Sequence, residues 1–292
     1  MEQFWAAYGS VVQFVLINMI LAISIYLTLY AGLLSLANAG FMAIGAYVAA
    51  VLTIYAGTPF ALNLLVGALA AALVGLLLGL PVLRLRGIYL AIATIGFGEI
   101  VRIVIISFDK FTGLTLLGGA QGLSGIPKLT TPVALLLTLA ALVFLLIQMQ
   151  RSRTGRALAA IRQDESVAAT MGINLFAYKV LVFVLGAFIA GLAGGFSAHL
   201  TRFIDPNGYG FDAAVNILAY AILGGTGHWA GPLVGAGILT ALPEALRFLK
   251  EYRGIVNGII IVLVILYLPR GLVNPDWFRR LSRRKEAEDA PG

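Results

Sequence analysis

The sequence predicts an all-α integral membrane protein: a polytopic bundle of about eight or nine transmembrane helices, some of them broken or re-entrant. Composition is the first reason, because 60% of the 292 residues are hydrophobic and only 11% are charged, against roughly 25% charged residues in a soluble domain. The second reason is that long apolar stretches recur along the chain. Abundant Leu, Ile and Val also exclude a disordered chain.

The apolar stretches set the expected crossings. A hydrocarbon core about 30 Å thick needs roughly 20 helical residues to span it. Stretches near this length lie at 11–31, 32–54, 60–83, 87–107, 131–150, 179–199, 211–227, 232–250 and 255–270. Because 211–227 contains Asp212, Asn216 and a Gly-Gly pair, we expect it to be re-entrant or broken. The transmembrane domain is therefore expected over residues 1–275, with a charged tail at 276–292.

The basic residues predict the orientation. The formal net charge is +7, and no Lys or Arg precedes Arg84. Beyond that point three clusters are formed by Arg84 and Arg86, by Arg151, Arg153, Arg156 and Arg162, and by Arg279, Arg280, Arg283, Arg284 and Lys285. Lys and Arg concentrate in the cytoplasmic segments of membrane proteins. We therefore expect these segments and the C-terminus to be cytoplasmic, and the N-terminus to lie outside.

The sequence lacks the residue patterns of common enzymes. It has no Cys, and its two His residues, His199 and His228, fall on different segments, which excludes thiol chemistry and most zinc sites. No Lys follows a Gly, so the chain has no P-loop for ATP. We therefore expect no enzymatic activity, catalytic residue, metal or cofactor.

A glycine-rich run interrupts the apolar sequence. It reads Gly224-Gly225-Thr226-Gly227-His228-Trp229-Ala230-Gly231-Pro232. A continuous helix is excluded here, because an interior Gly costs about 1 kcal/mol and an interior Pro about 3 kcal/mol. Irregular backbone at membrane depth persists only where protein buries it or where it lines a water-filled path. Residues 224–237 are therefore a candidate part of a translocation path.

Two charges fall inside a predicted span. Glu99 and Arg102 are three residues apart, so they share one helical face and can pair with each other. Ionisable residues within a membrane are functional candidates by default. Two interpretations stay open: a neutral pair that docks this helix against its neighbours, or a direct contact with a substrate.

The longest polar interruption between spans is residues 151–178. Thr154 can cap a helix with apolar positions at Ala157, Leu158 and Ile161, and Asp164 begins a second helix that ends at Gly172. Two short amphipathic helices without a core of their own need a surface to bury against. That surface is either the membrane interface or a groove on a soluble partner.

A family resemblance emerges from this segment. The pattern Glu165-x-x-Ala168-Ala169-x-x-Gly172 resembles a degenerate form of the Glu-Ala-Ala loop of ABC importer permeases. Further stretches resemble the M-type permease subunits of the high-affinity branched-chain amino-acid ABC transporter family. They are residues 30–47, 79–99, Gln121-Gly-Leu-Ser-Gly-Ile-Pro127, 223–236 and Tyr267-Leu-Pro-Arg-Gly271. Their order and spacing over nearly the whole chain carry the resemblance.

The resemblance implies a permease subunit of an ATP-driven importer of Leu, Ile and Val in the bacterial cytoplasmic (inner) membrane. It also implies three kinds of partner: a second, homologous permease subunit, two cytoplasmic ABC ATPase subunits, and an extracytoplasmic solute-binding protein. ATP hydrolysis would take place on the ATPase subunits, which fits the missing P-loop.

The same resemblance assigns roles to residues. The ATPase-coupling loop would use the polar side chains of Arg156, Arg162, Asp164 and Glu165, and close backbone approach at Ala168, Ala169 and Gly172. The substrate path would involve Ser35, Asn38, Gly40, Gly45, Glu99, Gly224, Gly225, Gly231 and Pro232. The binding protein would be met by Gln121, Gly122 and Ser124.

Two segments depart from the family pattern. Asn38 stands where His is common, and residues 111–119 are longer than the usual Thr-Gly-Gly turn. Both bear on the substrate, so a permease for urea or short-chain amides stays an alternative. A self-contained secondary transporter built from inverted repeats is a second one.

Overall fold

The computed structural model describes residues 2–113, 116–245, 258 and 272. The predicted tail 276–292 and nearly all of the predicted span 255–270 lie outside these residues.

Six helices have the length and composition to cross a membrane. They are α1 (Glu2–Tyr30), α2 (Asn38–Val51) with its π-helical continuation η1 (Leu52–Ala56), α3 (Phe60–Val82), α4 (Ile88–Thr112), α5 (Pro132–Arg151) and α8 (Leu175–Thr201). The polytopic, helical character of the chain is thereby confirmed. The described residues hold fewer full crossings than the eight or nine expected.

Two predicted crossings form shorter helices. These are α9 (Phe211–Gly224), with 14 residues, and α10 (Ala230–Ala245), with 16 residues. At 1.5 Å per residue α9 extends over about 21 Å, less than the roughly 30 Å of hydrocarbon. Helix α10 is described as far as Ala245, where the described part of this segment ends. The helix ends at the Gly224-Gly225 pair, where Gly225 adopts φ +91°.

Short elements connect the spans. The segment between α5 and α8 folds into α6 (Arg153–Gln163) and α7 (Glu165–Thr170). At the opposite end of the bundle lie η2 (Gly119–Gln121), β1 (Leu123–Ser124), β2 (Phe203–Ile204) and η3 (Pro206–Tyr209). The two strands pair antiparallel, with Leu123 opposite Ile204. In the part of the chain that the structure describes, this small ribbon is the sole departure from a helical fold.

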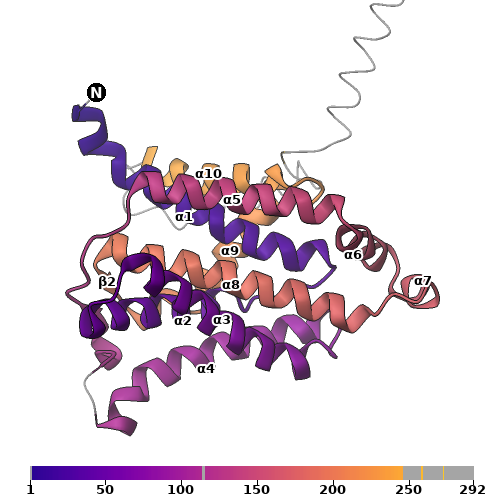
Figure 1. The fold of residues 1–292 in the computed structure, drawn as a ribbon, viewed down its shortest axis with the longest axis horizontal. Helices are drawn as coiled ribbons and strands as arrows, with labels where there is room; N and C mark the ends of the chain where they lie inside the picture. The colour runs from indigo at the N-terminus through magenta and orange to yellow at the C-terminus, as the bar shows by residue number, and fades with distance from the viewer. Residues whose placement is uncertain (1, 114–115, 246–257, 259–271, 273–292) are drawn as a thin grey trace, which may run out of the picture.

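Helix α8 lies in the middle of the bundle and packs against α1, α2 and α3 (Figure 1). Glycines permit the close approach: a Cβ added to Gly45 on α2 would lie 2.2 Å from the Gly191 carbonyl oxygen on α8. A Cβ on Gly194 would lie 2.0 Å from the Met42 carbonyl oxygen. Small residues at helix contacts are the usual means by which helices associate in lipid.

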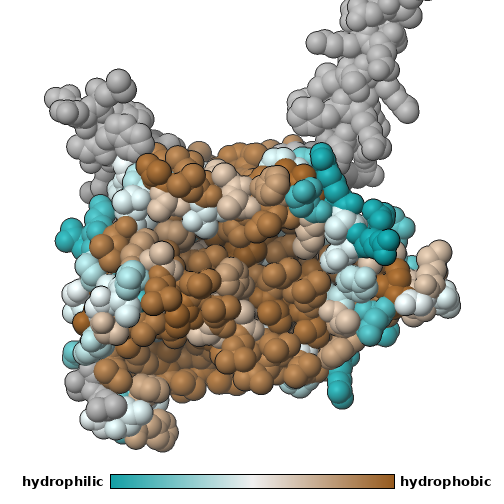
Figure 2. All heavy atoms as spheres, in the orientation of Figure 1, coloured by the Kyte–Doolittle hydropathy of each residue, from teal (hydrophilic) through white to brown (hydrophobic). Residues whose placement is uncertain are grey.

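Apolar side chains cover the middle of the molecule, and hydrophilic ones gather at its two ends (Figure 2). On α5, for example, Leu137, Phe144 and Leu145 are each at least 60% exposed. Soluble proteins rarely expose apolar surface on this scale. The belt fits burial in a bilayer and agrees with the class predicted from composition.

The fold collects separate basic segments at one end, which carries α6 and α7 and is called the basic end below (Figures 1 and 2). Arg86, in the turn before α4, forms an ion pair there with Glu165 of α7. Arg151 is the last residue of α5, and Arg153 and Arg156 are in α6. Two of the three predicted basic clusters therefore lie together, and the third lies outside the described residues.

Candidate functional site

The chain between α1 and α2 is not helical although it lies inside the bundle. Residues 33–36 have no regular structure, and Ser35, Leu36 and Ala37 are all buried. The Leu36 N–H donates to the Thr94 hydroxyl on α4 at 3.0 Å, and the Ala37 N–H donates to the Ser35 hydroxyl at 3.3 Å. Thr94 is six residues into α4, about 9 Å from its start. Side-chain oxygens thus replace the backbone partners that a helix would supply.

Asn38, the first residue of α2, is buried at the end of this break. Its amide nitrogen donates to the Ser24 hydroxyl of α1, and that hydroxyl donates to the Gly186 carbonyl of α8 at 2.9 Å. The Asn38 Oδ1 atom is buried and has no hydrogen-bond partner among the described residues. The break is therefore fixed by polar contacts to α1, α4 and α8.

The other predicted path residues of α2 pack against helices. Gly40 faces α4, where an added Cβ would lie 3.0 Å from the Phe97 ring, and Gly45 faces α8. The structure thus brings Ser35, Asn38 and Gly40 together at the break. Gly45 lies further along α2, in a backbone contact with Gly191.

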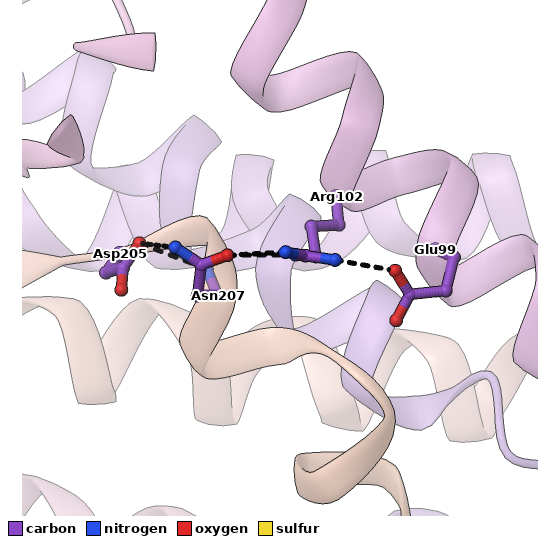
Figure 3. A network of polar contacts seen from close by, with 4 residues as sticks. All are labelled: Glu99, Arg102, Asp205 and Asn207. Carbon is purple, nitrogen blue, oxygen red and sulfur yellow. Dashed lines mark hydrogen bonds and ion pairs between the residues drawn. The ribbon is translucent and has the colours of Figure 1, made fainter. Parts of the chain in front are cut away.

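A polar network lies near the midpoint of α4 (Figure 3). Arg102 Nη1 donates to Glu99 Oε2 at 2.9 Å, and the two side chains are 34% and 35% exposed. Arg102 Nε and Nη2 donate to the Asn207 Oδ1 atom of η3 at 3.1 and 2.6 Å. Asn207 donates in turn to Asp205, at 3.1 Å from Nδ2 and 3.0 Å from its backbone N–H.

This network joins α4 to the start of α9. Glu99 is 11 residues into α4, about 17 Å along it, and it lines a small cleft with Leu36, Gly210 and Phe211. The connection 203–210 therefore reaches inward from the end opposite α6 and α7, and α9 begins near mid-depth. A charge at the bilayer centre costs about 2.5–3.5 kcal/mol on insertion scales. The partly exposed pair accordingly belongs at a surface covered by water or protein.

Tyr209 borders the same cleft and is buried. Burial raises the pKa of its phenol, and the nearby Asp205 carboxylate raises it further. The hydroxyl therefore stays neutral at physiological pH.

The glycine-rich run forms the turn between α9 and α10 at the basic end, rather than a break at mid-depth. Gly224 and Gly231 face each other so closely that a Cβ on Gly224 would lie 1.8 Å from the Gly231 carbonyl oxygen. Gly225 adopts φ +91°, a conformation that favours glycine, and Pro232 is in the first turn of α10. Their predicted role in the path stays a prediction.

Helix α6 contacts this turn. Arg162 Nη1 and Nη2 donate to the Thr226 carbonyl and hydroxyl oxygens at 3.1 and 3.0 Å. Leu158 and Ile161 are buried beneath the helix, which agrees with the predicted 3.6-residue period. The predicted cap was wrong, because Ser152 rather than Thr154 accepts a hydrogen bond from the Gly155 N–H. Arg156 stays exposed.

Helix α7 projects from the basic end (Figure 1). Asp164 caps it, accepting from the N–H groups of Ser166 and Val167 at 2.7 and 3.2 Å, as predicted. Gly172 ends it with φ +78°. Val167 and Met171 are 52% and 73% exposed, so two of the apolar positions of this predicted amphipathic helix form an uncovered tip.

Two coupling residues face inward instead of outward. Glu165 Oε1 accepts from Lys179 Nζ of α8 at 2.5 Å, and Oε2 lies 3.9 Å from Arg86 Nε. Ala168 is buried within the chain and Ala169 is exposed. Glu165 thus fastens α7 to the bundle, and Ala168 cannot meet a partner directly in this conformation.

The residues predicted to face a binding protein lie at the opposite end. Gln121 is in η2 and Ser124 in β1, and both are exposed. Gly122 has φ +77°, and a Cβ there would lie 2.4 Å from the Ile204 carbonyl oxygen. It is required for pairing of the two strands.

Sequence reasoning missed Lys179 and Asn207. Lys179 is a lone cation near the start of an apolar helix, and this isolation was the available signal that it pairs with a carboxylate. Asn207 follows Asp205-Pro206, a turn-forming sequence that gives no indication of contact with α4.

Comparison with protein families decides the class. A family model described as "Branched-chain amino acid transport system / permease component" matches residues 8–265. The chain belongs to this permease family. The resemblance inferred from the sequence is thereby confirmed, and the membership is that of a transport component rather than an enzyme.

Several curated relatives are similar to the permease. The permease protein LivM of Escherichia coli (strain K12) is 35% identical over 277 residues, which cover 83% of the chain and 64% of LivM. LivH of Salmonella typhimurium is 31% identical over 166 residues, covering 56% and 53% of the two chains. BraD of Pseudomonas aeruginosa is 34% identical over 128 residues, covering 43% and 41%. The chain thus spans less than two thirds of LivM, and no solved structure matches it significantly.

Proposed function

We propose that the chain is a membrane-spanning permease subunit of an ATP-driven importer that carries Leu, Ile and Val across the bacterial inner membrane. A second, homologous permease subunit, two cytoplasmic ATPases and an extracytoplasmic binding protein complete the importer. The observation that supports this most is the family match over 8–265. LivM, the relative that matches 83% of the chain, is named as a high-affinity branched-chain amino acid transport permease.

The basic end is the cytoplasmic end in this proposal. Arg84, Arg86, Arg151, Arg153 and Arg156 gather there, and the positive-inside rule places such clusters in the cytoplasm. Helix α1 begins at the opposite end (Figure 1). The N-terminus is therefore outside and the C-terminus cytoplasmic, and Gln121, Gly122 and Ser124 face the binding protein.

Helix α7 is the docking element for an ATPase. It stands away from the bundle with Val167 and Met171 exposed, and such an apolar tip fits a hydrophobic groove on a soluble partner. The exposed Arg156 and Asp164 supply the polar rim. Glu165 then transfers the movement of α7 to α8 through Lys179 and to the start of α4 through Arg86. Rigid-body displacement of helices follows when the ATPases close.

The test uses the tagged chain purified with its partners in mild detergent and then placed in liposomes. We expect two ATPases and a second permease to co-purify, and ATP with loaded binding protein to drive uptake of labelled leucine. Uptake of urea instead of leucine would identify the alternative substrate class. Activity of the chain alone, without ATP, would mean a secondary transporter and overturn the proposal.

Docking through α7 is tested by Met171→Asp. Placing a carboxylate in an apolar groove should reduce ATPase recovery at least tenfold, because an unpaired charge is then desolvated. Phe111→Asp is the matched control, since it also removes an exposed apolar side chain but at the opposite end. Equal ATPase recovery with both variants would contradict the docking role of α7.

A further inference from the structure

The Glu99–Arg102 pair combines features that a purely structural ion pair does not need. It lies near mid-depth on α4, and both side chains are about one-third exposed at the surface of the subunit. Apolar side chains surround it, since Ile103 on the same helix is 57% exposed. A helix that only had to dock could use apolar contacts alone. Paired opposite charges on an accessible face indicate that something charged is met there.

We propose that Glu99 and Arg102 bind the two ionised groups of the transported amino acid, with Glu99 contacting the ammonium group and Arg102 the carboxylate. This inference rests on the proposed function and deepens it, since it assigns a recognition step to the permease itself. The cargo class is a zwitterion with an aliphatic side chain. Urea and short amides carry no net charge, so they could form hydrogen bonds but no ion pairs with the two side chains.

The unused hydrogen-bonding capacity of both side chains fits this role. Among the described residues, Glu99 is hydrogen-bonded through Oε2 only. Its Oε1 atom lies 3.4 Å from the position of a Cβ added to Gly210, on the side of the cleft. Arg102 uses Nε, Nη1 and Nη2 once each. Because a guanidinium has five N–H donors, two remain, one on each terminal nitrogen, for a carboxylate.

Asn207 fixes the position of Arg102. The Asn207 Oδ1 atom accepts from both Nε and Nη2, and Asp205 orients Asn207 in turn. The guanidinium is thereby held at the start of α9, and its remaining N–H groups have no partner within the described parts of the chain. Asn207 is accordingly a positioning residue in this site, and Arg102 is the substrate contact.

The cleft beside the pair is lined mostly by apolar residues, which suits an aliphatic side chain. Leu36, Ile95 and Phe211 line it together with small residues. Its free volume is about 10 Å³, near the minimum for one water molecule. The site is therefore closed in this conformation, and an amino acid enters when α4 and α9 separate.

The test measures ATP-driven leucine uptake by the complete transporter in liposomes. Arg102→Met and Glu99→Gln should each lower the uptake rate at least tenfold. The exchange Glu99→Arg with Arg102→Glu retains an ion pair but reverses its polarity, and uptake should stay at least tenfold low. Stimulation of ATP hydrolysis by loaded binding protein should remain within twofold in all three variants, which shows that assembly and folding persist.

Further variants separate substrate contact from structure. The exchange Glu99→Arg with Arg102→Glu also removes the contact between Arg102 and Asn207 of η3. Asn207→Ala measures how much this lost contact alone lowers the uptake rate, and we expect a decrease of about threefold. Lys110→Met, which removes an exposed cation from the end of the same helix, should leave uptake unchanged. If Arg102→Met does not fold, Arg102→Lys is used in its place. Arg102→Lys should lower the maximal uptake rate by a larger factor than it raises the KM for loaded binding protein.

Two outcomes overturn the inference. Uptake within twofold of wild type in the single variants would mean that the pair contacts no substrate, and full recovery in the reversed variant would reduce it to a structural ion pair. Failure of the proposed function is recognised separately, because the wild-type complex would then take up no leucine.

Discussion

Helices α8 and α4 are similar in length and both apolar, yet the bundle holds them differently. Helix α8 contacts α1, α2 and α3 at glycines, and a Cβ added to Gly194 would overlap the α2 backbone. Helix α4 exposes Ile92, Ile100 and Ile103, and its Gly96 has nothing within 4 Å of an added Cβ. A groove of about 500 Å³ with apolar walls lies between the C-terminal half of α4 and α2.

The difference separates a fixed core from a helix that can move. Close backbone packing allows α8 a single arrangement. Helix α4 buries fewer side chains than α8, among them Phe97, which packs on Phe41 of α2. Polar contacts also join α4 and the turn before it to their neighbours: Arg86 to Glu165, Thr94 to Leu36, and Arg102 to Asn207. Contacts of this kind can be exchanged without repacking a core. We therefore expect α4 and α9 to move relative to the core formed by α8 with α1, α2 and α3 during transport.

The largest expected effect comes from placing the same side chain on both helices. Gly194→Leu on α8 should destabilise the isolated chain by about 3 kcal/mol or more, because the new side chain overlaps the Met42 backbone. Gly96→Leu on α4 is the matched variant and meets open space. Thermal unfolding in detergent should show a large loss for the first and none for the second. Equal losses would refute the difference in packing.

The next effect concerns the ion pair that joins α7 to the core. Lys179→Met leaves the Glu165 carboxylate partly buried beside a distant Arg86, and we expect a loss of about 2 kcal/mol with uptake reduced roughly tenfold. Uptake and binding-protein-stimulated ATP hydrolysis should be measured together, since uncoupling lowers the first more than the second.

The control for Lys179→Met is the double variant with Glu165→Gln. Removing both charges avoids the unpaired carboxylate, so the double variant should be more stable than Lys179→Met alone. Additive losses would show that the two residues do not interact.

Much of this arrangement was predictable from the sequence, because local rules govern it. Composition and apolar length predicted the membrane class, Asp164 and Gly172 predicted the limits of α7, and the spacing of Glu99 and Arg102 predicted their pairing. The glycine-rich run was correctly expected to break the helix. The depth of this run in the membrane was not predictable, because it depends on where α9 begins. Helix α9 begins near mid-depth, so the turn that follows it lies at the basic end.

Two of the unpredicted features are contacts between distant segments. Lys179 and Glu165 are 14 residues apart, and Arg102 and Asn207 are 105 apart. Both pairings are set by how helices cross, and neither follows from a periodicity in one segment. The inward direction of Glu165 and Ala168 has the same origin, because only the position of α8 decides which face of α7 is covered.

The smallest expected effect tests the contact between α6 and the turn after α9. Thr226→Val removes the hydroxyl that accepts from Arg162 Nη2 and keeps the carbonyl contact, so the exposed site should lose only about 0.5 kcal/mol. Thr201→Val is the control, since its hydroxyl bonds only to backbone atoms nearby in its own segment. If α9 moves together with α6 and α7, Thr226→Val should lower leucine uptake about twofold despite this small loss of stability, and Thr201→Val should leave uptake unchanged. Identical uptake in both variants would mean that α9 moves independently of α6. The movement of α6 and α7 would then reach α4 only through the Glu165–Arg86 ion pair.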